Sequence, residues 1–292
     1  MMRRMRSLLG VYMICTFLFV HVAYNRMKIN KHRQDPSTAI HLDLEPVIET
    51  LPLPNSTGVI SDNHTANIPH KPEIHAVLLF RLWGGDAFGM NLTHLSHWIS
   101  YMKDMCGVQE VHSYENCHSA AECTGVGKPW PEVDYFQAQY TAYVDAMNSM
   151  PNKDIWMLQM DLDEFPFMPG DTKPGFLQRF ISSLDADVTQ VLLPCVFFGG
   201  KPENNDDRLP VQFTHRMPEP EHGRMKPLFR LDAAESMRFR EVHGMTMRQG
   251  RTVVADAKEL RMNHYWGDRM AAGSVRDTGL RDWLLHGLAS SL

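Results

Sequence analysis

The sequence predicts an α/β fold in which a mostly parallel sheet is flanked by helices, and three observations predict it. Short apolar runs typical of buried strands alternate with segments whose apolar residues recur at helical spacing. Glycine and proline punctuate these runs. Residues 73–292 are numerous enough to bury one core. The alternation contains no internal repeat and no glycine-rich phosphate loop.

A strand, a helix and a second strand open the predicted domain. Ile74–Phe80 is an apolar run that a glycine pair follows. The helix after it is expected to be capped near Thr93 and to stop at Gly107. Its apolar face consists of Leu92, Leu95, Ile99, Met102 and Cys106. Val108–Tyr114 is the second predicted strand.

Two further helix–strand units complete the predicted order. One helical face consists of Phe136, Tyr140, Tyr143, Val144 and Met147. It leads into a strand that ends at Met160. Another face consists of Phe176, Leu177, Phe180, Ile181 and Leu184, and it leads into a strand over Thr189–Phe198. The order implies helices on both faces of the sheet.

The amino terminus predicts a membrane anchor. Residues 1–7 carry three arginines, and residues 8–24 form an uncharged apolar run just long enough to span a bilayer. A cleaved signal peptide is the alternative, but no clear small-x-small cleavage site follows the run. Basic residues on both sides leave the orientation open. We therefore expect an uncleaved signal anchor behind a short cytosolic tail.

The next segment, residues 25–72, predicts a flexible stem, because it is polar, rich in proline and without apolar periodicity. Asn55, Asn63 and Asn91 each begin an Asn-x-Thr acceptor pattern for glycosylation. These patterns favour a luminal domain over residues 73–292, and thus a single-pass type II protein of the Golgi or ER membrane.

The distribution of charge along the chain bears on which partners it can bind. Seven of the 29 Lys and Arg residues precede residue 34, and none of the 34 Asp and Glu residues does. The rest of the chain therefore has 22 basic and 34 acidic residues, a formal charge of −12. Nucleic acid is therefore not expected as a partner.

Cys117 and Cys123 are spaced to close a short loop, but pairing stays open among the cysteines of the luminal part. Cysteine spacing does not match a compact zinc site.

Three carboxylates at the end of a predicted strand are the strongest chemical signal. Asp161, Asp163 and Glu164 follow the apolar run that ends at Met160. Ligands of α/β proteins bind at the carboxyl ends of strands. Alternation predicts that Asp161 and Asp163 point to the same side. Two hard oxygen ligands there suit Mg²⁺ or Mn²⁺ with substrate phosphates, whereas a polar turn is the plainer interpretation.

Several sequence blocks between residues 74 and 266 resemble, in the same order, the family-92 glycosyltransferases and related family-2 members. The blocks are Trp98-Ile99 with Tyr101, Cys106-Gly107-Val108, Tyr114-Glu115-Asn116, Asp161–Phe165, Phe198-Gly199-Gly200, Lys226–Arg230, His243-Gly244 and Asn263-His264-Tyr265. The resemblance implies a GT-A fold, a nucleotide-sugar donor, a divalent metal, a glycan or glycoconjugate acceptor and inverting transfer. The chain departs from the pattern at Trp266-Gly267-Asp268-Arg269, where the family often has Lys-Ser.

The resemblance also implies roles for the carboxylates and for a distant histidine. Asp163 is the expected direct metal ligand, and Asp161 is expected to contact the ribose, the metal or both. Glu164 is expected to orient these two groups. His264 matches a metal ligand by position, with His243 as the rival and a buried structural role as the plainer alternative.

Other candidates bind the donor or act on the acceptor. Lys226 and Arg230 share one face of a predicted strand and could clamp a diphosphate, although two solvated charges would look the same. Asn116 follows a strand and could contact the nucleoside. The general base stays open among Asp206, Asp207 and Glu235.

Two other classes of function remain open at this stage. Paired aspartates also serve metal-dependent phosphoryl or diphosphate hydrolases. A non-catalytic carbohydrate-binding relative would share the resemblance without turnover.

Overall fold

The computed structural model describes residues 71–82, 90–117, 119–130, 134–237 and 242–286. All of them belong to the compact unit Ile48–Leu292. The predicted tail (1–7), the membrane segment (8–24), the stem up to residue 70, and the acceptors Asn55 and Asn63 lie outside the described residues. Within the described ranges, no helix has the length and apolar character needed to cross a bilayer.

The predicted α/β class is confirmed, and the fold is built on a mixed sheet of eleven strands. The strands β1 (Ile74–Phe80), β2 (Glu110–Glu115), β3 (Lys128–Pro129) and β4 (Trp156–Met160) pair in parallel in the order β4-β1-β2-β3. The long strand β8 (Glu221–Arg230) lies between β4 and β6 (Val188–Gly199) and runs antiparallel to both.

The remaining strands extend the sheet around β6. They are β5 (Glu164–Phe167), β7 (His215–Arg216), β11 (Arg251–Val254), β12 (Arg261–Gly267) and β13 (Val275–Arg276). Strand β12 pairs in parallel with β6 and antiparallel with β5. Short elements complete the chain: η2 (Ala120–Glu122), α5 (Leu209–Gln212), η3 (Leu231–Ala233), the separate β9–β10 pair (Ala234–Ser236, Thr246–Met247) and α6 (Gly279–His286).

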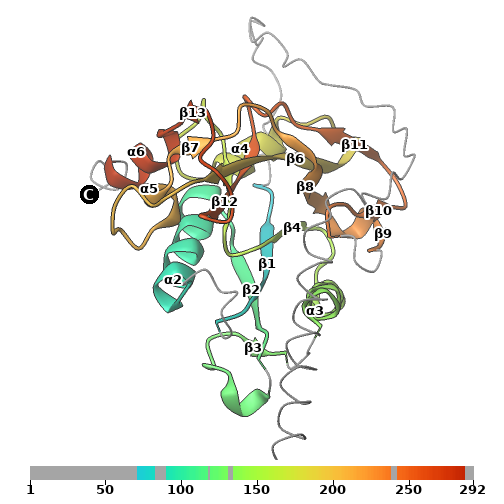
Figure 1. Cartoon of the computed structure of the whole chain (residues 1–292). Helices are drawn as coiled ribbons and strands as arrows, with labels where there is room; N and C mark the ends of the chain where they lie inside the picture. The colour runs from blue at the N-terminus through green and yellow to red at the C-terminus, as the bar shows by residue number, and fades with distance from the viewer. Residues whose placement is uncertain (1–70, 83–89, 118, 131–133, 238–241, 287–292) are drawn as a thin grey trace, which may run out of the picture. The chain divides into compact units, whose positions relative to one another are not determined.

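Helices cover both faces of the parallel strands, as alternation along β1 requires (Figure 1). Leu78 and Phe80 pack into a core shared with α2 (Leu92–Ser100), its π-helical continuation η1 (Tyr101–Cys106) and α4 (Phe176–Ser182). Val77 and Leu79 point to the other face, where α3 (Tyr135–Ser149) packs. The sheet is therefore buried on both sides in this region, which is why β1 reads as a continuous apolar run.

The ends of α2 and η1 follow from two residues. Asn91 is the N-cap, and its Oδ1 accepts hydrogen bonds from the backbone N–H groups of Thr93 (2.8 Å) and His94 (3.1 Å). The predicted cap at Thr93 is wrong, because the asparagine two residues earlier reaches the free N–H groups. The predicted stop at Gly107 is confirmed, because this residue ends η1 with a left-handed φ of 79°. A Cβ atom added at Gly107 would lie only 2.7 Å from Oε1 of Gln178, so a larger residue would not fit there.

The parallel pairing brings the carboxyl ends of β1, β2 and β4 to one edge of the sheet. Phe80 pairs with Glu115, and Leu78 pairs with Met160. The residues that follow these strands, including Asn116 and Asp161, therefore lie along the same edge.

Candidate functional site

The three carboxylates lie on a turn between β4 and β5. Strand β4 ends at Met160, and the N–H of Glu164 donates to the carbonyl of Asp161 at 3.1 Å. Asp161 and Asp163 follow the last residue of β4, so strand alternation no longer determines which way they point, and the prediction that they share a side stays a prediction. The two aspartates contact different partners, described below.

Lys226 neutralises Asp161 and Glu164 from within the protein. Its Nζ lies 2.9 Å from Oδ2 of Asp161 and 3.0 Å from Oε2 of Glu164, and its side chain is completely buried. The antiparallel pairing of β8 with β4 delivers it, since Leu228 pairs with Leu158. Burial raises the pKa of Glu164 to about 7 against the attraction of Lys226. The two carboxylates overcome the effect of burial and raise the pKa of Lys226.

Glu164 and helix α3 fix the position of Asp161. Oε2 of Glu164 accepts a hydrogen bond from the backbone N–H of Asp161 at 2.8 Å, so Glu164 restrains the turn, and its role in orienting the two aspartates stays a prediction. Gln139 donates from Nε2 to Oδ1 of Asp161 at 2.6 Å and to the hydroxyl of Tyr143 at 3.2 Å. Gln139 could not be predicted as part of the site, because a polar residue beside an apolar helical face is ordinarily solvated.

His264 is the imidazole closest to the carboxylate of Asp163 among the contacts described. It pairs with Glu164 in the β12–β5 ladder, and its Nε2 lies 3.4 Å from Oδ2 of Asp163. Its Nδ1 lies 3.6 Å from Oε1 of Glu164 and 3.7 Å from Sγ of the buried Cys195. Burial lowers the pKa of His264, but the carboxylates, Asp163 foremost, outweigh burial and raise it.

Arg269 covers the same carboxylate from the turn after β12. Its Nη2 lies 2.5 Å from Oδ2 of Asp163, and its Nε donates to the carbonyl of Trp266 at 3.0 Å. Burial would raise the pKa of Asp163, but His264 and Arg269 hold it well below its usual range. Sequence reasoning missed Arg269; the only signal was the departure from the family pattern over residues 266–269.

His243 approaches the cluster from the side of Lys226. Its Nδ1 lies 3.1 Å from the carbonyl oxygen of Met225. Burial, followed by the charge of Lys226, lowers the pKa of His243 to about 4. Of the two predicted histidine ligands, the structure therefore brings His264 to Asp163 and leaves His243 beside a cation.

Arg230 lies at the other end of the strand that carries Lys226. It pairs with Trp156, the first residue of β4, and its Nη2 lies 2.6 Å from Oδ2 of Asp232. Four residues of extended strand span roughly 13 Å. The prediction that Lys226 and Arg230 clamp one diphosphate is therefore wrong: they share a strand face but lie at opposite edges of the sheet.

Asn116 lies at the same edge as Asp161, at the end of β2. Its Oδ1 accepts from Nε of Arg81 at 2.7 Å, and its Nδ2 donates to the carbonyl of Trp130 at 3.0 Å. The guanidinium of Arg81 lies 5.0 Å from the ring centroid of Tyr135. Burial and then the charge of Asp161 raise the pKa of Tyr135. Asn116, Arg81 and Tyr135 therefore form a series of contacting side chains that leads toward Asp161. The neighbouring loop also carries a disulfide between Cys117 and Cys123.

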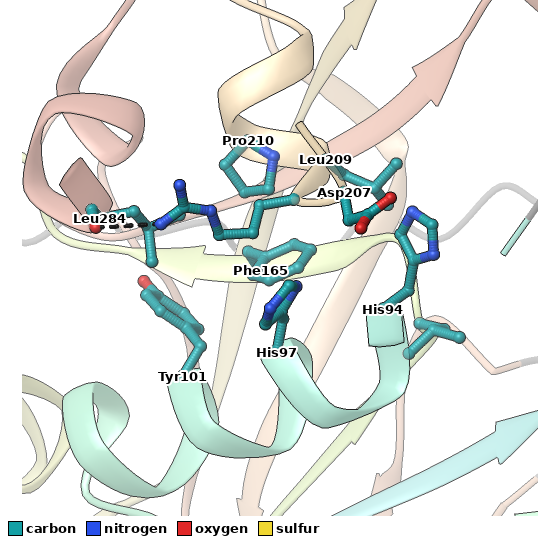
Figure 2. Close-up of a pocket in the computed structure, with 10 residues that line it drawn as sticks. His94, His97, Tyr101, Phe165, Asp207, Leu209, Pro210 and Leu284 are labelled. Carbon is teal, nitrogen blue, oxygen red and sulfur yellow. Dashed lines mark hydrogen bonds between the residues drawn. The ribbon is translucent and has the colours of Figure 1, made fainter. Parts of the chain in front are cut away.

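The three predicted general bases are not brought to the carboxylates by any contact in the described part of the chain. Asp206 pairs with Arg208 at 2.7 Å. Glu235 is exposed on the small β9–β10 pair. Asp207 lines a cavity of about 20 Å³ with His94 and other side chains of α2 and α5 (Figure 2). That volume admits about one water molecule and not a sugar.

A larger pocket opens beside His264. It measures about 320 Å³ and is lined by Phe197, Met217, Pro218, Glu219, Pro220, Glu221, Trp266 and Met270. The ring centroids of Phe197 and Trp266 are 4.7 Å apart, and that of Phe197 lies 5.0 Å from that of His264. The pocket is therefore adjacent to the carboxylate cluster and has an aromatic wall.

A separate group of side chains has metal-ligand spacing. His75, Glu110 and His112 each present one ligand atom, all within 4.8 Å of one another, and these side chains can bind a metal ion. Among the described residues, Asp161, Asp163 and His264 do not form such a group. The carboxylate of Asp161 forms an ion pair with Lys226 instead, and that of Asp163 forms one with Arg269.

Comparisons with known proteins leave the family unassigned. No family model matches the chain, and no curated protein matches it. A solved structure of CMP:2-keto-3-deoxy-manno-octonic acid synthetase complexed with CTP aligns over 75% of this chain and 100% of its own, at 12% identity and a TM-score of 0.28. A likeness this weak carries no weight for activity, so the function proposed below rests on the side chains of the site.

Proposed function

We propose that this protein transfers a sugar from a nucleotide-sugar donor to a glycan or glycoconjugate acceptor, with a divalent cation and a GT-A-like fold. The observation that carries the proposal is the carboxylate turn Asp161–Glu164 at the carboxyl ends of parallel strands, with a buried lysine and an imidazole on it. The blocks that resemble family-92 and family-2 glycosyltransferases include these residues. Inversion at the sugar carbon is part of the same proposal.

In the proposed site, the donor's diphosphate is bound through a divalent cation that Asp163 helps to hold. Carboxylate oxygens and an imidazole nitrogen are a donor set that suits Mn²⁺, and Mg²⁺ less well. Asp163, His264 and the partly exposed Asp161 would hold the cation, which neutralises charge on the leaving diphosphate. Arg269 lies where positive charge is needed and has a side chain 29% exposed, whereas that of Asp163 is 9% exposed. The cation therefore competes with a guanidinium that can move into solvent.

The nucleoside is bound along the edge that runs to Asn116. Asn116 and Arg81 supply amide and guanidinium groups, and Tyr135 supplies an aromatic ring between them and Asp161. Amide groups can read base or ribose edges, and a ring can support the flat face of a base. The two ends of one nucleotide sugar are thereby matched to one continuous edge of the sheet.

The acceptor is bound in the aromatic pocket beside His264. Its volume of about 320 Å³ lies within the usual range for small-ligand sites. Phe197 and Trp266 offer apolar faces to a sugar ring. Glu219 and Glu221 line the same pocket, and they replace Asp206, Asp207 and Glu235 as the general-base candidates, because a base must reach the acceptor hydroxyl.

The membrane arrangement expected from residues 1–72 is part of the proposal. We infer a type II anchor, a stem and a luminal catalytic domain in the Golgi or ER. The uncharged apolar run over residues 8–24 and the acceptor patterns for glycosylation that follow it support this arrangement.

A donor screen tests the function. Full-length protein with Mn²⁺ is incubated with a panel of nucleotide sugars and candidate glycans, and both nucleoside diphosphate and glycosylated product are measured. We expect Asp163→Asn to lower turnover at least ~100-fold. Asp171→Asn is the matched control, because Asp171 also pairs with an arginine (Arg179, 2.8 Å) but lies outside the cluster.

The same screen separates the alternatives. Release of sugar phosphate without any acceptor indicates the hydrolase. Donor binding without turnover of any substrate indicates the non-catalytic relative. Full turnover by Asp163→Asn would contradict the site assignment.

A further inference from the structure

We propose that His75, Glu110 and His112 form a Zn²⁺ site at the amino-terminal edge of the sheet, separate from the carboxylate cluster. The strands β1 and β2 pair with His75 opposite Glu110 and with Val77 opposite His112. Glu110 and His112 are two residues apart, so alternation points both to one face of β2. The register then puts all three side chains beside one another.

The separations of the three ligand atoms fit a zinc ion. Nδ1 of His75 lies 3.0 Å from Nε2 of His112 and 3.7 Å from Oε2 of Glu110. Nε2 of His112 lies 3.8 Å from the same oxygen. The nearest point equidistant from three atoms so spaced lies in their plane, about 2 Å from each, which is the Zn–N and Zn–O distance in proteins. Two imidazoles favour zinc over Mg²⁺ or Ca²⁺, which prefer oxygen ligands.

A neighbouring carboxylate already orients one of the ligands. Oε1 of Glu73 lies 2.9 Å from Nε2 of His75, the ring nitrogen that does not face the group. A proton on Nε2 that is donated to Glu73 leaves the lone pair of Nδ1 directed at His112 and Glu110. Carboxylate–histidine–zinc arrangements in proteins use this contact to fix the tautomer.

Burial divides the group into a fixed part and an open part. The side chains of His75 and His112 are 8% and 19% exposed, whereas that of Glu110 is 61% exposed. Solvent at Glu110 leaves room for water as the fourth ligand.

The alternative is a simple hydrogen bond between two histidines. It explains the distance of 3.0 Å, but it does not require a carboxylate on the far ring nitrogen of one histidine and another beside both rings. A bound ion uses all four groups, and it joins β1 to β2 at the end opposite Arg81 and Asn116.

Zinc titration of the full-length protein tests the proposal. Protein stripped with a chelator is titrated with Zn²⁺ against a chromophoric competitor, and melting is followed with and without the ion. We expect one tightly bound equivalent, and a rise in Tm of at least about 4 °C at a 100-fold excess over Kd. His112→Gln and Glu110→Gln should weaken binding at least ~10-fold and abolish the rise in Tm.

Two controls exclude other zinc ligands. His215→Gln removes an exposed histidine that pairs with Glu203 at 3.1 Å, and it should bind zinc like the wild type. Asp163→Asn should also retain the tight equivalent, so failure of the proposed function does not decide this result. Melting without metal verifies that the variants are folded. The proposal is overturned if the wild type binds no zinc below ~100 µM, or if His112→Gln and Glu110→Gln bind it unchanged.

Discussion

Nη2 of Arg269 lies 2.5 Å from Oδ2 of Asp163, so a guanidinium from the turn after β12 covers the carboxylate proposed to hold the donor's cation. The arginine is the more exposed partner, at 29% against 9% for the aspartate side chain. Arg269 is therefore the partner nearer to solvent. In the proposed site, a bound cation would compete with this arginine for the carboxylate of Asp163.

Arg269→Ala should lower the Mn²⁺ concentration needed for half-maximal donor binding by about 10-fold, because the variant removes a competing charge from Asp163. Calorimetric titration of nucleoside diphosphate at several Mn²⁺ concentrations measures this. Arg179→Ala, which frees Asp171 instead, should leave the metal requirement unchanged. Loss of diphosphate binding by Arg269→Ala at saturating Mn²⁺ would show that the arginine itself binds the phosphates.

Lys226→Met should destabilise the protein by about 3–5 kcal/mol, because Asp161 and Glu164 would lose the buried cation between them. Arg230→Met is the control on the same strand. Its partly exposed pair with Asp232 should contribute less than about 1 kcal/mol. Denaturant unfolding of both variants gives the comparison, and equal losses would show that Lys226 is not the charge that holds the turn.

The pairing of His264 with Asp163 should depend on pH. The folded-state pKa of His264 is raised, so the stability from its charged form is fully present below pH 6.5 and is lost as pH rises through the raised value. The pKa of Asp163 is depressed, so its contribution is present above its ordinary value of 3.8 and is lost as pH falls through the depressed value.

A double-mutant cycle of His264→Gln and Asp163→Asn at pH 6 and pH 9 measures this coupling. We expect at least ~1 kcal/mol at pH 6 and a clear decrease at pH 9. His264→Gln should also weaken Mn²⁺ affinity by about 10-fold if the imidazole is a ligand. A lower Tm with unchanged metal dependence would make His264 structural and return the search to His243.

Glycan attachment at Asn55 and Asn63 tests the membrane arrangement. In a eukaryotic host, glycosidase should shift the wild-type band more than that of the Asn55→Gln/Asn63→Gln variant. Protease added outside intact vesicles should leave the main domain uncut. Cleavage of the domain together with absence of glycan would mean the reverse orientation.

Asn91 needs a different substitution because it also caps α2. Asn91→Asp keeps the capping oxygen while removing the acceptor nitrogen. Asn91→Gln should in addition cost about 1 kcal/mol of stability. Thermal unfolding of the two variants separates the cap from the glycan. Equal stability of both variants would contradict the capping role.

The local elements were largely predictable because each depends on periodicity within one segment. The predicted strand ending at Met160 is β4 (Trp156–Met160), and the helical face from Phe136 to Met147 lies within α3. The insertion of β8 between β4 and β6 was not predictable, because strand order is set by contacts between distant segments. That insertion explains why Lys226 reaches Asp161 while Arg230 does not.

The site was predictable only where one segment held its chemistry. The Asp161–Glu164 carboxylates are close together in the sequence, and the resemblance singled out His264, which the structure brings within 3.4 Å of Asp163. Arg269 reaches Asp163 through a turn whose conformation the sequence does not specify. His75 lies next to His112 only through the β1–β2 register, across 37 residues, so no compact metal-ligand spacing exists to be recognised.

Binding of nucleoside diphosphate by the full-length protein tests the central claim most directly. UDP, GDP and CDP are titrated with Mn²⁺ or with EDTA into the wild type, Asp163→Asn and Asp171→Asn, all with melting curves as controls for folding. The proposed site predicts that at least one nucleotide binds only with Mn²⁺, that Asp163→Asn weakens this binding at least ~100-fold, and that Asp171→Asn does not. Binding that is unchanged in EDTA or in Asp163→Asn, or no binding of any nucleotide by the wild type, would contradict it.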